Sequence, residues 1–291
     1  MAKNLIIGGF TNYNYNQLKP WVESIDECGF TGDKVLAVGN TTEETIRELL
    51  DRKFILIDIP NDLNIPIHVA RFIFIYEYLV NHWQQYEFII TTDVKDVYFQ
   101  KNPVEWLRDN LKENYKLVAG SESLLYMDEP WGDDNLKNSY GPYVYELYKN
   151  KIIYNVGTIG GYSEYVKDMI FNIFTNAVNR PIPICDQAVY NVLINTQPFK
   201  DITYFADQCD GWAVQAGTTA DPSKIENFRK TLIEAEPQFV DGLILTGQDS
   251  LKGGCKKGTP FTIVHQYDRV PEWKQNVMKK YKLEDLIVIR T

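Results

Sequence analysis

The sequence has few cysteines, and their spacing does not resemble a disulfide-rich scaffold. Cys28, Cys185, Cys209 and Cys255 are scattered over 291 residues without a CxxC pair. Small domains that depend on disulfides carry cysteines at much higher density. We therefore expect all four cysteines to be reduced thiols.

The sequence also lacks long apolar runs. No segment approaches the roughly 18 uninterrupted apolar residues of a membrane-spanning helix. The first residues, MAKNLIIGGFTNYNY, have neither the apolar core nor the small-residue cleavage site of a signal peptide. We expect no transmembrane segment, and the cytoplasm is the predicted location.

The chain has fewer basic than acidic residues. The 30 lysines and arginines are outnumbered by 39 aspartates and glutamates, which gives a net charge of −9. Such a field repels nucleic acids and anionic membranes, so we expect no nucleic-acid partner. A nucleotide remains compatible with this charge because a metal ion can supply the positive charge that a diphosphate needs.

No Pro-, Gly- or Ser-rich linker and no internal repeat divides the chain. In the first half, strand patterns alternate with helix patterns, which is typical of βα units that build a parallel sheet. We expect strands at NLIIGGF, KVLAVGN, KFILIDI and YEFIITTD, and helices over 16–28, 42–51 and 66–83. Later segments such as KIIYNVGTIGGY and DQAVYNVLI mix the two patterns. The prediction is one α/β domain, residues 1–291, with a mixed, mostly parallel central sheet flanked by helices.

Two carboxylates end the fourth predicted strand. The segment YEFIITTDVKDVYF leads directly into Asp93 and Asp96. Ligands of open α/β sheets collect at the carboxyl ends of strands, where carboxylates can hold a divalent cation against a diphosphate. A strand-end cap and a solvated turn would explain the same residues, so this motif alone leaves both interpretations open.

A late strand pattern, IVHQYDRVPEWK, delivers His265 and then Arg269 and Lys274. A neutral imidazole can complete a carboxylate metal site, and the two cations can neutralise phosphate charge. A buried histidine bonded to a backbone carbonyl is the simpler alternative. His68 and His82 lie in a helical pattern and are weaker ligand candidates.

Two further motifs lie between these segments. NVGTIGG, which contains Asn155 and Gly157, permits close backbone approach and offers an amide for hydroxyl groups. Its spacing is not the GxGxxG of a dinucleotide-binding dehydrogenase. In PICDQAVYN, Asp186 and Gln187 open a predicted helix, where Asp186 could equally serve as a simple cap.

In this order, TDVKD, NVGTIGG, CDQ and HQYDRVPEWK resemble the motifs of GT-A nucleotide-diphospho-sugar glycosyltransferases. The resemblance is to the glycogenin-like and lipopolysaccharide galactosyltransferase-like group and covers roughly residues 4–274. It implies a GT-A, Rossmann-like fold with a nucleotide-binding half, 1–103, and an acceptor-side half with a C-terminal metal-ligand segment, 104–291. It also implies transfer of a sugar from a nucleoside diphosphate to a hydroxyl of a glycan or glycoconjugate, with Mn²⁺ or Mg²⁺.

The resemblance assigns roles to individual residues. Asp96 and His265 would hold the metal ion, and Asp186 with Gln187 would hold the donor sugar near its anomeric carbon. Other residues would contact the donor: Arg71, Arg269 and Lys274 at its phosphates, Asn155 and Gly157 at its sugar, and Phe10, Asn12 and Tyr13 at its nucleoside.

The acidic motif departs from the usual pattern. DVKD has two residues between its carboxylates instead of one, so Val94 occupies the position of the expected acid. Asp93 must then reach the metal or the ribose from a shifted backbone, which a β-bulge could provide.

The acceptor side is less defined. Aromatic faces beside carboxylates suit sugar rings, and two tryptophans are candidates for such a role: Trp131, and Trp212 together with Gln215. Trp212 could equally be a core residue. The resemblance favours retention of configuration, whereas an inverting enzyme would need a base, for which Asp186 and Asp210 are candidates.

Two alternatives remain. A sugar-nucleotide pyrophosphorylase would share the nucleotide-binding plan, but GGFTNYNYNQ has no cation before Lys19 where such enzymes carry a basic loop. A non-catalytic carbohydrate-binding protein would fit the aromatic content of 13%, but it has no use for the acidic motif together with His265.

Overall fold

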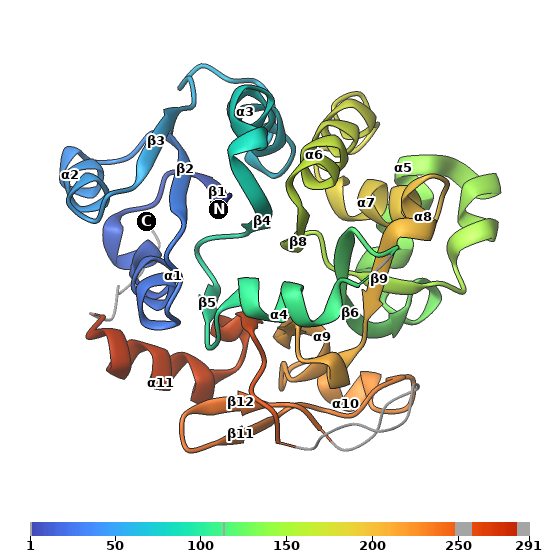
Figure 1. Ribbon diagram of the computed structural model, residues 1–291. Coiled ribbons are helices and arrows are strands. Elements are labelled where there is room, and N and C mark those ends of the chain that lie inside the picture. Colours follow the sequence, from blue (N-terminus) through green and yellow to red (C-terminus); the bar gives the residue numbers. More distant parts are fainter. Residues whose placement is uncertain (1, 113, 248–257, 284–291) are drawn as a thin grey trace, which may run out of the picture.

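The computed structural model describes residues 2–112, 114–247 and 258–283, and Figure 1 shows their arrangement. The strands are β1 Lys3–Thr11, β2 Asp33–Gly39, β3 Ile55–Asp58, β4 Tyr86–Thr92, β5 Val97–Phe99, β6 Leu117–Leu125, β7 Ile152–Tyr154, β8 Thr158–Tyr162, β9 Thr203–Ala206, β10 Ala213–Gln215, β11 Gln238–Val240, β12 Leu243–Leu245 and β13 Ile263–His265. The helices are α1 Tyr15–Glu27, α2 Glu43–Asp51, α3 Ile67–His82, α4 Pro103–Asn110, α5 Pro130–Tyr148, α6 Ser163–Ala177, α7 Asp186–Ile194, α8 Phe199–Ile202, α9 Ala216–Thr219, α10 Ile225–Phe228 and α11 Pro271–Tyr281.

The main sheet has eight strands in the order β3, β2, β1, β4, β8, β6 and β7, with β9 beside β6. Strands β1 to β4 pair in parallel, and β9 is parallel to β6. Strand β8 runs antiparallel to both β4 and β6 and so joins the first half of the chain to the second. The mixed, mostly parallel sheet predicted from the sequence is confirmed.

Helices cover both faces of this sheet (Figure 1), which explains why its strands read as continuous apolar runs. Side chains of β1 point alternately to the two faces. Leu5 and Ile7 pack with buried residues of α3 and α6, whereas Ile6 packs with those of α1. The first two helices begin at sequence-encoded caps, since Asn14 forms a capping box with Gln17 and Thr42 accepts a hydrogen bond from the Thr45 amide.

A smaller sheet has the strand order β10, β13 and β5. β13 runs antiparallel to β5, with His265 opposite Val97, and parallel to β10, with His265 opposite Gln215. Because β5 follows directly after the end of β4, this small sheet places β13, which ends in His265, near the carboxyl end of β4.

One expectation about the cysteines is wrong. Cys28 and Cys185 are free thiols, as predicted, but Cys209 is disulfide-bonded; Cys255 lies outside the described residues. Among the described residues, no helix combines the length and the apolar composition needed to cross a membrane.

Candidate active site

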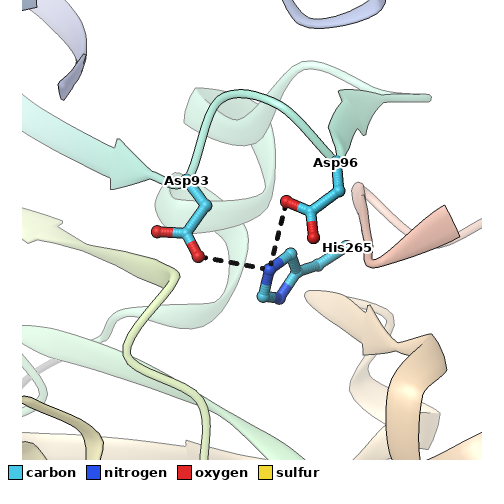
Figure 2. A group of neighbouring side chains, drawn as sticks. All are labelled: Asp93, Asp96 and His265. Carbon is cyan, nitrogen blue, oxygen red and sulfur yellow. Dashed lines mark ion pairs between the residues drawn. The ribbon is translucent and has the colours of Figure 1, made fainter. Parts of the chain in front are cut away.

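Asp93, Asp96 and His265 form a compact group, which we call the acid–histidine cluster. Each offers one ligand atom, and these atoms all lie within 4.8 Å of one another. His265 Nε2 is 3.4 Å from Asp93 Oδ2 and 3.7 Å from Asp96 Oδ1. Figure 2 shows the two aspartates on either side of the loop between β4 and β5, both pointing toward the imidazole.

The loop geometry explains how two residues can separate the carboxylates. The chain bends over residues 94–96 instead of forming the predicted bulge. Val94 turns inward and is buried against β1, where a Cβ on Gly8 would lie only 2.5 Å from its Cγ1. The backbone is held from the other side because the Gln266 amide donates to the Asp96 carbonyl at 2.7 Å. The buried Val94 and the Gln266–Asp96 backbone bond thus anchor the loop whose two carboxylates face His265.

His265 is fixed by a buried hydrogen-bond chain. Its Nδ1 lies 2.7 Å from Gln215 Oε1, and Gln215 Nε2 donates to Thr158 Oγ1 at 3.0 Å. Because an amide oxygen only accepts, Nδ1 must carry the proton. In the neutral ring, the Nε2 lone pair then faces the two aspartates, which is the arrangement of a metal-ligating histidine.

Arg71 of α3 connects two carboxylates. Its Nη1 donates to Asp93, and its Nη2 donates to Asp186 Oδ2 at 3.3 Å. Burial alone would raise the pKa of Asp93, but Arg71 and His265 outweigh it and lower that pKa. For Asp186, burial prevails and the pKa is raised.

At Asp96 and His265, burial and the neighbouring charges shift the pKa in opposite directions. Burial raises the pKa of Asp96 despite the neighbouring His265. Burial lowers the pKa of His265, but Asp96 and Asp93 outweigh this effect and raise it. Carboxylates held this close in a buried site are stabilised by a cation, so the electrostatics favour a bound positive ion.

The NVGTIGG segment lies against the cluster. The Asp93 amide donates to the Gly157 carbonyl at 3.0 Å, and a Cβ on Gly157 would lie 2.8 Å from Asp93 Oδ2 and 2.9 Å from His265 Cε1. Asn155 accepts from the Gly157 amide at 2.7 Å and donates to Glu122 Oε1 at 2.6 Å. Both polar ends of the Asn155 side chain are therefore used inside the protein.

Two cavities meet at the cluster. The larger cavity has a volume of about 390 Å³ and the smaller cavity about 210 Å³. Both are lined by His68, Arg71, Asp93, Asp96 and Arg269. The larger cavity continues to Asn155, Asp186, Gln187 and His265, and the smaller one to Phe10, Tyr13 and Asp268. The acidic groups thus stand on a wall that both cavities share.

No family model matches the sequence, and no curated protein matches it by sequence comparison. Solved structures are similar over most of the chain. The apo structure of the bifunctional glycosyltransferase WbbM has a TM-score of 0.54 and 12% identity over 97% of this chain and 52% of its own. The galactosyltransferase LgtC, in complex with donor and acceptor sugar analogues, has a TM-score of 0.50 and 13% identity over 90% of this chain and 86% of its own. The chain has the GT-A glycosyltransferase fold.

Mouse xyloside xylosyltransferase 1, in its apo form, is also similar, with a TM-score of 0.47 and 12% identity over 90% of this chain and 97% of its own. The chain spans about half the length of the WbbM structure. At these identities the similarity establishes the GT-A fold alone.

Within the GT-A fold, the predicted nucleoside contacts lie at the smaller cavity and beside it. Phe10 and Tyr13 line the smaller cavity and stack with ring centroids 6.2 Å apart. Asn12 lines a neighbouring cavity and accepts a hydrogen bond from Asn40. Its φ of 64° is left-handed, which asparagine tolerates better than most residues.

Other predicted residues lie elsewhere in the GT-A fold. Lys274 lines neither of the two cavities but a third one on α11. Asp210 also lines neither cavity, and its Oδ1 accepts from the Tyr204 hydroxyl at 2.9 Å. Trp212 is fully buried and donates to the Thr158 carbonyl at 3.0 Å, so the core interpretation of this residue is correct.

Glu122 is a site residue that the sequence reasoning missed. It lines the larger cavity, and burial raises its pKa to about 7. The segment KLVAGSES places this glutamate inside an apolar strand pattern, where a carboxylate needs buried partners. That pattern is the sequence feature from which Glu122 could have been predicted. Gln215 was noted for the acceptor side, but no local pattern links it to a histidine 50 residues away.

Proposed function

We propose that this protein is a metal-dependent glycosyltransferase that transfers a sugar from a nucleoside diphosphate to a hydroxyl acceptor on a glycan or glycoconjugate. One observation carries the proposal: the acid–histidine cluster lies where two cavities meet. A donor of this kind has a nucleoside at one end, a sugar at the other and a diphosphate between them. The smaller cavity would take the nucleoside and the larger cavity the sugar, with the diphosphate at the acid–histidine cluster between them.

The donor set supports a divalent cation. Donor atoms that share one ion lie within about 4.3 Å of one another, because each is about 2.1 Å from it. The two distances from His265 Nε2, 3.4 Å and 3.7 Å, satisfy this condition, and all three ligand atoms lie within 4.8 Å of one another. Asp93, Asp96 and His265 would hold the ion, and the two carboxylates suit Mn²⁺ or Mg²⁺. A bound ion supplies charge stabilisation for the departing diphosphate.

The chain's own residues would orient the donor. Phe10 and Tyr13 would meet the nucleoside in the smaller cavity. Arg269 lines both cavities and would contact the diphosphate. Asp186 and Gln187, both buried in the wall of the larger cavity, would hold the sugar. Arg71 would act partly by positioning Asp93 and Asp186, to which it is already bonded.

A binding experiment tests this proposal. Thermal unfolding would be followed with UDP-, GDP-, dTDP- and CMP-sugars, each with and without Mn²⁺, because ligands of the native state raise its apparent stability. We expect one nucleotide class to stabilise the protein only when Mn²⁺ is present. Asp96→Ala and His265→Ala should abolish the stabilisation, and metal-independent binding in these variants would contradict the proposed site.

Product analysis separates transfer from the alternative reaction. Incubation with the stabilising nucleotide-sugar, Mn²⁺ and a saccharide acceptor should release nucleoside diphosphate while the sugar is joined to an acceptor hydroxyl oxygen, which loses its proton. Release of pyrophosphate from a nucleoside triphosphate and a sugar 1-phosphate, without an acceptor, would instead identify a pyrophosphorylase.

A further inference from the structure

The larger cavity extends beyond the residues assigned to the donor. Its wall includes Glu129 and Trp131 at the start of α5, Thr218 in α9, and Asp221 and Lys224 between α9 and α10. None of these five residues lines the smaller cavity. This part of the wall comes from the second half of the chain and is available for a second substrate.

Trp131 differs from the tryptophans of the core. Its exposed fraction is 49%, whereas Trp21 and Trp212 are completely buried. An indole ring left open in a cavity wall exposes a large apolar face, which suits the C–H face of a sugar ring. The backbone on either side of Trp131 is held locally, because Glu129 caps α5 by accepting from the Gly132 amide at 2.6 Å.

Two carboxylates accompany this aromatic face. Glu129 is 5% exposed and Asp221 is 7% exposed. The capping bond uses Glu129 Oε2, and Asp221 Oδ1 accepts from the Ser223 amide at 2.9 Å and from its hydroxyl at 2.7 Å. The second oxygen of each carboxylate has no hydrogen-bond partner among the described residues and can accept from a hydroxyl group.

The charge of the wall selects among sugars. Glu129 and Asp221 bring two carboxylates to this part of the wall, against one cation, Lys224, whereas Asp93 and Asp96 farther along it are the residues that would hold the metal ion. A sugar acid brought to this wall would meet like charge. An uncharged ring meets no such repulsion.

We infer that Trp131, Glu129 and Asp221 form an acceptor subsite for an uncharged sugar ring, which stacks on Trp131 and donates hydroxyl hydrogen bonds to the two carboxylates. This inference rests on the proposed function, because it assigns the second substrate of the same site. It commits to a neutral saccharide and excludes a uronic or sialic acid at this position.

The test measures saccharide binding without the donor. An array of immobilised neutral and acidic oligosaccharides would be probed with the wild-type protein, and the tightest neutral ligand would then be titrated in solution. We expect Trp131→Ala to weaken its binding at least tenfold and Trp131→Phe to restore it to within about threefold, because phenylalanine keeps an aromatic face. Tyr143→Ala is the matched control, because Tyr143 is an aromatic residue of the same helix that is 88% exposed and lines neither cavity.

The outcomes distinguish this inference from the proposed function. Unchanged binding in a folded Trp131→Ala variant, preferential binding of acidic saccharides, or no neutral ligand on the array would overturn the subsite. Binding that depends on Trp131 in a protein that binds no nucleotide-sugar would support the subsite and contradict the transferase. Folding of each variant would be checked by its circular dichroism melting curve.

Discussion

At the scale of single residues, the contact between Gln215 and His265 determines which imidazole nitrogen faces the carboxylates. We predict that Gln215→Leu weakens Mn²⁺ binding about 10- to 100-fold, the usual effect of losing the hydrogen bond behind a metal ligand. Calorimetric titration with Mn²⁺ measures this change. Gln100→Leu is the matched control, because the Gln100 side chain bonds, within the described part of the chain, only to backbone atoms of residues 244 and 261. That variant should lose stability but keep its Mn²⁺ affinity, and an equal loss of affinity in both variants would mean that Gln215 acts through the fold.

A second prediction at the scale of single residues concerns Glu122 and how the free energy of unfolding depends on pH. Burial raises its pKa from 4.5 to about 7. Between these values the folded state keeps the proton and the unfolded state releases it, so the free energy of unfolding falls as pH rises through this window. The total loss is about 3 kcal/mol, since one pKa unit is worth about 1.4 kcal/mol.

Glutamine at position 122 cannot ionise, so in Glu122→Gln the free energy of unfolding should no longer fall with pH through this window. The variant should therefore be more stable than the wild type above pH 7. Denaturant unfolding in EDTA at several pH values measures it. Glu164→Gln removes an exposed carboxylate and serves as the control. A slope that persists in Glu122→Gln would assign the proton to another group.

At the scale of elements, β8 brings Gly157 against the cluster through its antiparallel pairing with β4. The φ of Gly157 is not left-handed, so alanine is excluded here by space and not by backbone conformation. Overpacking typically costs about 1–3 kcal/mol, and we predict that Gly157→Ala weakens Mn²⁺ binding on the order of tenfold.

Gly29→Ala is the contrasting case. A Cβ at Gly29 meets open space, but its φ of 78° is left-handed. The variant should lose about 1 kcal/mol of stability without a change in Mn²⁺ affinity. Both properties can be measured on the same samples by unfolding and by titration, and wild-type Mn²⁺ affinity in Gly157→Ala would refute the argument from space.

The elements also show what the sequence could predict. The first four strands and three helices lie within a few residues of their predicted bounds because alternating and helical periodicities reflect which face is buried. Helix α5 was not predicted, because Gly141 leaves helical geometry with a φ of 76° and Pro142 follows it. The order of motifs indicated the acid–histidine cluster, but the positions of Lys274 and Asp210 depend on tertiary packing that one sequence does not display.

At the scale of the whole molecule, the cluster joins distant parts of the chain. Asp93 and Asp96 follow β4, and His265 ends β13, which is paired with β5. Strand β8 also links residues 158–162 directly to β4. These connections across the boundary at residue 103 support the expectation of one domain.

We therefore predict a single calorimetric unfolding transition that Mn²⁺ shifts as a whole. At a Mn²⁺ concentration 100 times its Kd the added stability is about 2.7 kcal/mol. For a chain of 291 residues, whose unfolding entropy is about 0.6 kcal/mol/K, that corresponds to about 4–5 °C in Tm. His265→Ala should remove most of the shift. His82→Ala should retain it, because His82 Nδ1 lies 2.7 Å from the Tyr78 carbonyl oxygen and His82 lines neither of the two cavities at the cluster. If Mn²⁺ moved only one of two separate transitions, the halves would fold independently, and a metal ion could not tie them together.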